Sequence, residues 1–148
     1  MLFSQGSHFG GHALYIKDNR LHYAYNFVGS FVQTVAANEP LPTGENLILS
    51  ASFERDGEDP PGVSTGILSL FHAEHKVAEK RIKTQPGMFG ISGTGLAVGR
   101  SVTAITDDYP GARPWHFRGG TLHFVAVDVS GEPYVDLERE AEAMLMRE

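Results

Sequence analysis

Apolar and polar residues alternate along much of the chain with the period of two that a half-buried β-strand requires. The alternation is clearest between residues 12 and 27, where a break at Lys17–Arg20 separates two runs. Asp18 and Asn19 lie in this break, and both residue types tolerate the left-handed conformations of a tight turn. We therefore predict an antiparallel hairpin.

The same criterion predicts further strands over residues 31–37, 47–53, 67–71, 77–82, 96–98 and 122–129. Residues 67–71 and 77–82 form a second hairpin that turns near 73–75. Residues 122–129 are apolar on both parities, which is typical of a central strand covered on both faces. Residues 54–66 and 107–120 are rich in turn-forming residues, so we predict surface loops there.

The period changes only at the end of the chain. Apolar residues after Pro133 fall on one helical face, which predicts an α-helix over about residues 134–147. Glycine and proline together number 17 plus 8 among 148 residues, which indicates many turns. We predict an all-β fold in one domain, residues 1–148: a jelly-roll-like antiparallel β-sandwich with one C-terminal helix.

Composition excludes several classes of function. Twelve Lys and Arg against 18 Asp and Glu give a net charge of -6, which disfavours binding to nucleic acid or to an anionic membrane. The chain has no cysteine, so disulfides, thiolate metal sites and a cysteine nucleophile are excluded. Its first residues show no secretion signal, and the default expectation is a cytoplasmic protein.

Two short patterns suggest chemistry but have simpler interpretations. Residues Gly62–Gly66 match the Gly-x-Ser-x-Gly motif, but a strand rather than a helix is predicted to follow, so we assign no nucleophile. His72 and His75 flank the second turn, and alternation is expected to direct them differently. His8 and His12 lie in a glycine-rich segment. We interpret these histidines as surface residues rather than metal ligands.

Asp107 and Asp108 are the best candidates for oxygen ligands to a metal ion. Adjacent carboxylates on a loop can hold calcium if further oxygens complete six to eight ligands. The same residues followed by Tyr-Pro-Gly also form an ordinary turn, and we favour the turn. No cofactor is therefore expected, with calcium as the alternative.

The same loop carries Tyr109, Arg113, Trp115 and His116. Exposed aromatic and arginine side chains mark many kinds of interface, and aromatic rings can stack on sugars. These four residues are the candidate ligand-binding set. The alternative is that the aromatic rings pack in the core or at its rim.

Several blocks of the sequence, in order along nearly the whole chain, resemble one family. They are residues 2–18 (LFSQGSHFGGHALYIKD), 21–27 (LHYAYNF), 81–87 (RIKTQPG), 106–111 (TDDYPG) and 129–136 (VSGEPYVD). Together they resemble the C-terminal accessory region of bacterial arylsulfatases. The resemblance implies a concanavalin A-like or laminin G-like sandwich, a fold in which loop edges sometimes bind calcium.

The resemblance also implies where catalysis takes place. In that family the nucleophile is a formylglycine made from a Cys/Ser-x-Pro-x-Arg motif, and this chain contains no such motif. We therefore expect a non-catalytic accessory domain whose partner is a sulfatase catalytic domain, in cis or in trans. The alternative from another class is a free-standing carbohydrate-binding, lectin-like module.

A homodimer is a further expectation. The chain starts inside the first resembling block, so we expect the first strand to have an exposed edge that pairs with a second copy. The C-terminal helix is the alternative contact for the dimer.

Overall fold

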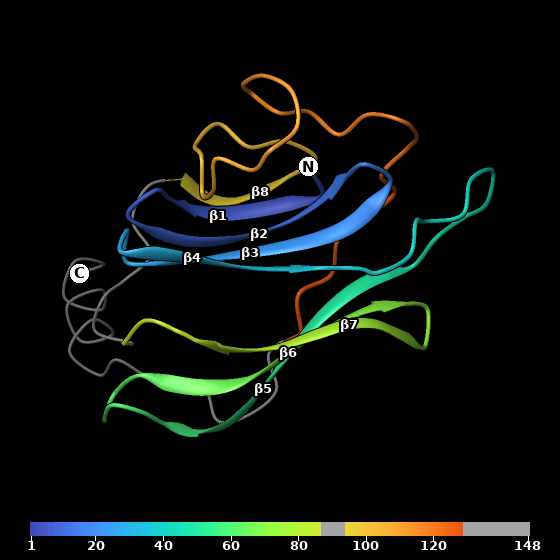
Figure 1. The fold of residues 1–148 in the computed structure, drawn as a ribbon. Helices are drawn as coiled ribbons and strands as arrows, with labels where there is room; N and C mark the ends of the chain where they lie inside the picture. The colour runs from blue at the N-terminus through green and yellow to red at the C-terminus, as the bar shows by residue number, and fades with distance from the viewer. Residues whose placement is uncertain (87–93, 129–148) are drawn as a thin grey trace, which may run out of the picture.

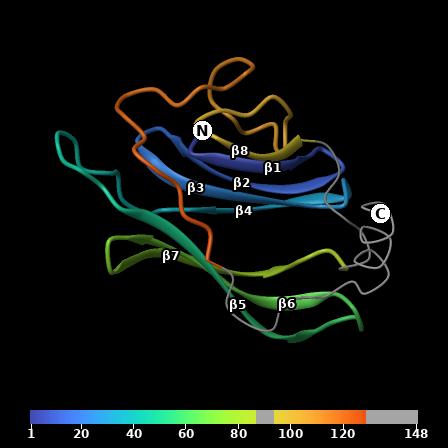
Figure 2. The same cartoon turned by 180° about the vertical axis from the view of Figure 1, so that it is seen from behind.

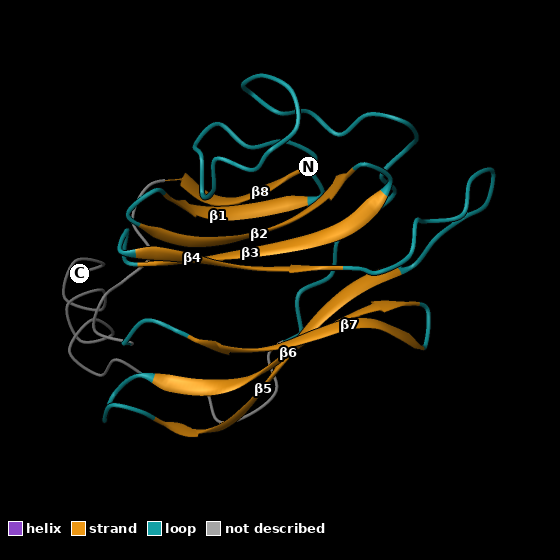
Figure 3. Ribbon diagram, in the orientation of Figure 1, coloured by secondary structure: helices purple, strands orange, loops and turns teal. Residues whose placement is uncertain are grey.

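The computed structural model describes residues 1–86 and 94–128, and within these ranges every regular element is a β-strand (Figures 1 and 3). The strands are β1 (Phe3–Ser7), β2 (Gly10–Lys17), β3 (Arg20–Phe27), β4 (Phe31–Ala36), β5 (Leu49–Glu58), β6 (Ser64–His72), β7 (His75–Lys83) and β8 (Thr94–Val98). The prediction of an all-β fold is confirmed for this part of the chain.

The strands form two antiparallel sheets that lie face to face as two layers (Figures 1 and 2). One sheet has five strands in the order β4-β3-β2-β1-β8, and the other has three in the order β5-β6-β7. β1 pairs with β2 on one side and with β8 on the other. The expected exposed edge on the first strand is therefore wrong, because β8 covers it, and a dimer would need a different contact.

Both predicted hairpins are confirmed. β2 and β3 are joined by Asp18 and Asn19, whose φ values of 50° and 56° are left-handed, as a two-residue primed turn requires. β6 and β7 are joined through Ala73, which is also left-handed. The short local turns explain why these strand pairs were readable from the sequence.

The inner core lies between the two sheets. Leu14, Leu21 and Tyr23 of the five-stranded sheet share one buried cluster with Leu68 and Leu70 of the three-stranded sheet. Leu21 and Leu70 are fully buried. Burial of each such side chain contributes roughly 1.5–3 kcal/mol to folding, so this shared core holds the two layers together.

Hydrogen bonds also join the layers at the side where β4 faces β7. The Gln33 side-chain amide donates to the Lys83 carbonyl oxygen at 2.7 Å and accepts from the Lys83 amide at 2.8 Å. The Lys80 ammonium donates to the carbonyl oxygen of Thr34 at 3.3 Å. The Gln33 side chain thereby bonds the backbone groups of Lys83 that a neighbouring strand would otherwise bond at the end of β7.

The predicted loop over residues 54–66 is shorter in the structure. β5 continues to Glu58 and β6 begins at Ser64. A register shift occurs because Arg55 pairs with Gly66 and Gly57 pairs with Thr65, which leaves an extra residue in β5. A bulge of this kind lets turn-forming residues stay within an edge strand, a possibility that composition alone does not distinguish from a loop.

The predicted central strand over residues 122–129 is wrong for the part that the structure describes. Residues 121–128 pair with none of the eight strands. Phe124 is 79% exposed and Val127 is 62% exposed, although Leu122 packs against the inner core. A pattern of apolar residues indicates a strand but cannot supply the neighbouring strand whose hydrogen bonds would form the ladder.

The predicted helix over residues 134–147 lies outside the described residues. Among the described residues, no helix has the length and hydrophobicity needed to cross a lipid bilayer.

Gly66 supplies a test of how closely β5 and β6 pack. A methyl group on Gly66 would lie 2.2 Å from the backbone oxygen of Glu54 and 2.8 Å from the Phe53 ring. We predict that Gly66→Ala lowers the free energy of unfolding by about 2 kcal/mol, because the backbone would have to shift. Gly95 lies in β8, and a methyl group added there would meet no neighbouring atom within 4 Å. Gly95→Ala should therefore change the free energy of unfolding by less than about 0.5 kcal/mol. Equal effects of the two substitutions in denaturant titrations would contradict the predicted strand contact.

Candidate functional site

Residues 99–117, here called the outer loop, lie against the face of the five-stranded sheet that points away from the inner core (Figures 1 and 2). The ends of the loop meet, since the Phe117 amide donates to the Gly99 carbonyl oxygen at 2.7 Å. Asn26 of β3 donates to the Ile105 carbonyl oxygen at 2.9 Å, and Thr103 donates to the Gly6 carbonyl oxygen at 2.8 Å. These bonds fix the loop to the sheet.

Apolar burial under the outer loop forms a second cluster. Ala13, Tyr15 and Ala24 of the sheet are fully buried beneath Ile105 and Tyr109 of the loop. β2 and β3 therefore have buried residues on both faces, although hairpin strands in a two-layer fold more often present one face to water.

Asp108 provides the polar link between the outer loop and the sheet. Its carboxylate accepts a hydrogen bond from the Tyr15 hydroxyl at 2.8 Å and pairs with the Lys17 ammonium. The bond from Lys17 is the main reason that the pKa of Asp108 is lowered, and Tyr15 adds to the effect. Burial and the bond to Asp108 raise the pKa of the Tyr15 hydroxyl, so it stays a donor.

His22 lies beside this link. It is directly opposite Tyr15 in the strand register, and the two rings stack with centroids 5.3 Å apart. Its Nδ1 is 3.9 Å from a carboxylate oxygen of Asp108. Burial is the main reason that the pKa of His22 is lowered; the Asp108 carboxylate acts in the opposite direction, and the charge of the Lys17 ammonium adds to the lowering. The imidazole is therefore held mainly neutral near pH 7.

An aromatic series continues from this point to the surface. The Tyr109 ring meets Tyr15 edge-on at 5.2 Å and meets Trp115 edge-on at 5.2 Å. The Arg113 guanidinium lies over the Trp115 ring, 5.5 Å from its centroid. Tyr109 is only 8% exposed, and burial raises its pKa to about 12.

The structure thus brings together four of the six residues that the sequence singled out: Asp108, Tyr109, Arg113 and Trp115. Asp107 and His116 lie exposed on the outer loop. The ring of Tyr109 packs against protein on both sides, so Arg113, Trp115 and His116 are the members of the set that a ligand could reach.

Protein contacts of Asp108 compete with the binding of a calcium ion. Both oxygens of its carboxylate already have protein partners, so a calcium ion would have to displace Lys17 or Tyr15. In the described ranges, no three His, Asp or Glu side chains converge as a metal site requires. Calcium at Asp107 and Asp108 stays the alternative to the turn.

The register corrects the prediction for one histidine pair. His72 and His75 lie directly opposite each other at the end of the β6–β7 hairpin. Directly opposed residues in an antiparallel pair project to the same face, so the expectation that they point apart is wrong.

The sequence did not indicate the partners of Asp108. Tyr15 and Lys17 are on the outer parity of β2, and His22 is on the same face of β3. A signal was present, because a large aromatic on the parity opposite Leu14 and Ile16 needs its own cover. The identity of that cover could not be read locally, since Asp108 is 93 residues away from Tyr15.

Comparisons with known proteins give no assignment. No family model matches the chain, and no curated protein or solved structure matches it either.

Removing the Asp108 carboxylate should loosen the outer loop. We predict that Asp108→Ala lowers the free energy of unfolding by about 1–2 kcal/mol, because Tyr15 would keep a buried hydroxyl without its acceptor. The emission of Trp115, the single tryptophan, should shift to the red as the loop opens. Asp107→Ala is the matched control, since this neighbouring carboxylate is exposed. The same change in both variants would contradict the assigned role.

Titration of His22 should make stability depend on pH. The pKa of His22 is lowered in the folded state from its ordinary value of 6.5, so the unfolded chain binds more protons as pH falls below that value. Stability should be complete above about pH 6.5 and decrease with acidification through this window. His22→Phe keeps a ring against Tyr15 and should flatten the dependence, leaving the part due to His12, whose pKa burial also lowers. Parallel curves for parent and variant between pH 7.5 and 5 would contradict this assignment.

Proposed function

We propose that this chain is a non-catalytic accessory domain that packs against a sulfatase catalytic domain and stabilises or shapes its substrate entrance. The observation that carries the proposal is the ordered resemblance of five blocks to the C-terminal region of bacterial arylsulfatases, together with the missing Cys/Ser-x-Pro-x-Arg motif. In this proposal the parent enzyme hydrolyses sulfate esters, and this chain takes no part in the bond-breaking step.

The positions of four of the five resembling blocks support a structural role, and the fifth, residues 129–136, lies outside the described residues. Residues 2–18 and 21–27 form β1, β2 and β3, and residues 106–111 lie on their outer face. The block that begins at Arg81 contacts β3, since the Gln85 amide donates to the Tyr25 hydroxyl at 2.9 Å. Blocks that converge in this way are expected to maintain a fold, whereas catalytic residues would converge on an accessible cleft.

The finer fold belongs to the same proposal. Two facing antiparallel sheets with a shared core support a β-sandwich. We propose a jelly-roll-like, concanavalin A-like sandwich for the whole domain, with the C-terminal helix over residues 134–147 as an additional element.

A carbohydrate-binding module is the second candidate. The observation favouring it is the exposed Arg113 guanidinium over the partly exposed Trp115 ring on the outer loop. A sugar could stack on such a surface. Tyr109 would support Trp115 from beneath rather than contact the sugar, because its ring is buried.

Sedimentation velocity distinguishes the two candidates. The chain should form a one-to-one complex with an arylsulfatase catalytic domain that lacks its own C-terminal region, and should hydrolyse no aryl sulfate ester by itself. Turnover by the purified chain, free of contaminating enzyme, would overturn the accessory role. Absence of a complex, together with millimolar or tighter glycan binding that Trp115→Ala abolishes, would favour the carbohydrate-binding module.

A further inference from the structure

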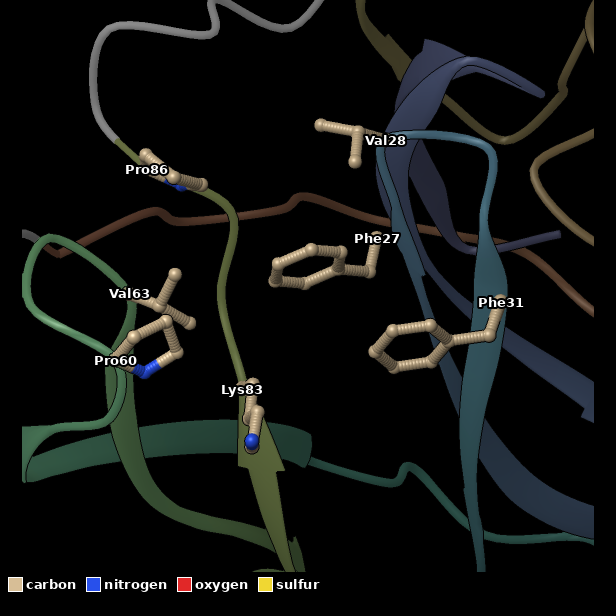
Figure 4. Close-up of a pocket in the computed structure, with 7 residues that line it drawn as sticks. All are labelled: Phe27, Val28, Phe31, Pro60, Val63, Lys83 and Pro86. Atoms are coloured by element: carbon tan, nitrogen blue, oxygen red, sulfur yellow. The ribbon is translucent and has the colours of Figure 1, made fainter.

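A cavity of about 360 Å³ lies at one end of the two sheets, within the size range of small-molecule sites (Figure 4). Its described lining comes from three separate segments: Phe27, Val28 and Phe31 around the β3–β4 turn, Pro60 and Val63 at the β5–β6 turn, and Lys83 and Pro86 at and just after the end of β7. Six of these seven residues are apolar, and the seventh carries a positive charge. No part of this cavity belongs to the outer-loop cluster.

The two phenylalanines form an apolar wall of two stacked rings. Phe27 and Phe31 are directly opposite each other across the β3–β4 pair, and their rings stack with an interplanar angle of 10° and centroids 4.9 Å apart. Phe31 remains 46% exposed. Figure 4 shows both rings extending from the β3–β4 side toward the segment that carries Lys83 and Pro86. An exposed, rigid aromatic face of this kind suits a planar apolar group.

The turn beside this wall is strained. Val28 has a φ of 44°, in the left-handed region that a β-branched residue rarely adopts. The Gly29 amide donates to the Asn26 side chain at 2.8 Å, which helps to hold the turn. Strain of this kind persists only where the surroundings enforce it, and it is enriched at functional sites.

Lys83 supplies the charge. Gln33 bonds both the amide and the carbonyl oxygen of Lys83, so the backbone at this position is fixed while the exposed ammonium can reorient. A second hollow of about 290 Å³ shares Phe31 and Lys83 with the first and is also lined by Arg81. Arg81 is already paired with Asp56. Among the described residues that line this groove, Lys83 is therefore the cation available to an incoming anion.

Local charge argues for an anionic rather than a neutral or cationic ligand. Glu58, two residues before Pro60, is bound by Arg55 and by the Gly62 amide. A cation next to an apolar wall fits a ligand that has an apolar body and one anionic group.

We propose that this groove binds an aromatic carboxylate or sulfonate, with its ring against Phe27 and Phe31 and its oxyanion at the Lys83 ammonium. The proposal is independent of the accessory role and of any contact with a catalytic domain. Insertion of a partner protein's side chain is the competing occupant, and the test below distinguishes it.

The test uses two probes of one shape, naphthalene-2-sulfonate and the neutral naphthalene-2-methanol, titrated into the full chain and followed by amide chemical shifts. The sulfonate should bind saturably with a dissociation constant of about 1 mM or below. The shifts should be centred on residues 27–31, 60–63 and 83. The neutral probe should bind more weakly at the same residues.

Matched variants separate the charge from the apolar wall. Lys83→Met should weaken sulfonate binding about 3- to 10-fold and leave the neutral probe unchanged, as expected for loss of one partly exposed ion pair. Lys76→Met removes the same charge at the other end of β7 and should change neither. Phe31→Ala should weaken both probes about equally. Val28→Gly relieves the backbone strain and should weaken both probes without loss of stability.

Three results would overturn the proposal. They are an absence of saturation by about 10 mM sulfonate, shifts centred away from the groove, and equal effects of Lys83→Met and Lys76→Met. Binding of a protein partner that Phe31→Ala abolishes, with no binding of either probe, would assign the groove to a docked side chain instead.

Discussion

Both faces of the five-stranded sheet carry apolar residues, and the rest of the structure depends on covering each of them. The inner face is covered by the three-stranded sheet, and the outer face by the outer loop. Most of the stabilisation under the loop comes from burial of side chains such as Tyr15 and Ile105, at roughly 1.5–3 kcal/mol each. A partly exposed ion pair adds about 1 kcal/mol at most, so the Asp108–Lys17 pair contributes less to stability than this burial and acts with the Asn26 and Thr103 hydrogen bonds to position the loop.

Local structure was readable from the sequence wherever short-range physics decides it. The alternation from Leu14 to Phe27, broken by Asp18 and Asn19, specified the first hairpin and placed Tyr23 and Tyr25 in the inner core. The bulged end of β5 was misread because Gly57 and its acidic neighbours occur in bulges as readily as in loops. The β8–β1 pairing was missed because it joins residues far apart in the sequence, which no period of two can indicate.

At the two sites as well, the sequence indicated residues that are close along the chain and did not indicate contacts between distant segments. The sequence identified two sets of candidates on one loop: Asp107 and Asp108 as metal ligands, and Tyr109, Arg113, Trp115 and His116 as a ligand-binding set. The sequence did not reveal that Tyr15 and Lys17 bond both oxygens of the Asp108 carboxylate. Asp107 and Asp108 therefore looked more available to a metal ion than the geometry makes them. The cavity at Phe27 and Lys83 had no sequence signal, since three separate segments line it.

The proposed accessory role is consistent with a sheet that is covered on both faces. The outer loop is bonded to the sheet, and its outward side chains, such as Arg113 and His116, are exposed. A loop that is already held in place by the sheet loses little conformational entropy on association. A domain of this kind can stabilise a neighbour without contributing a group to its chemistry.

The most direct test of the accessory role is the thermal inactivation half-life of an arylsulfatase catalytic domain lacking its C-terminal region, measured with and without this chain. If the chain packs against that domain, saturating amounts should lengthen the half-life several-fold while the chain alone stays inactive. Identical half-lives at every concentration of the chain would contradict the accessory role.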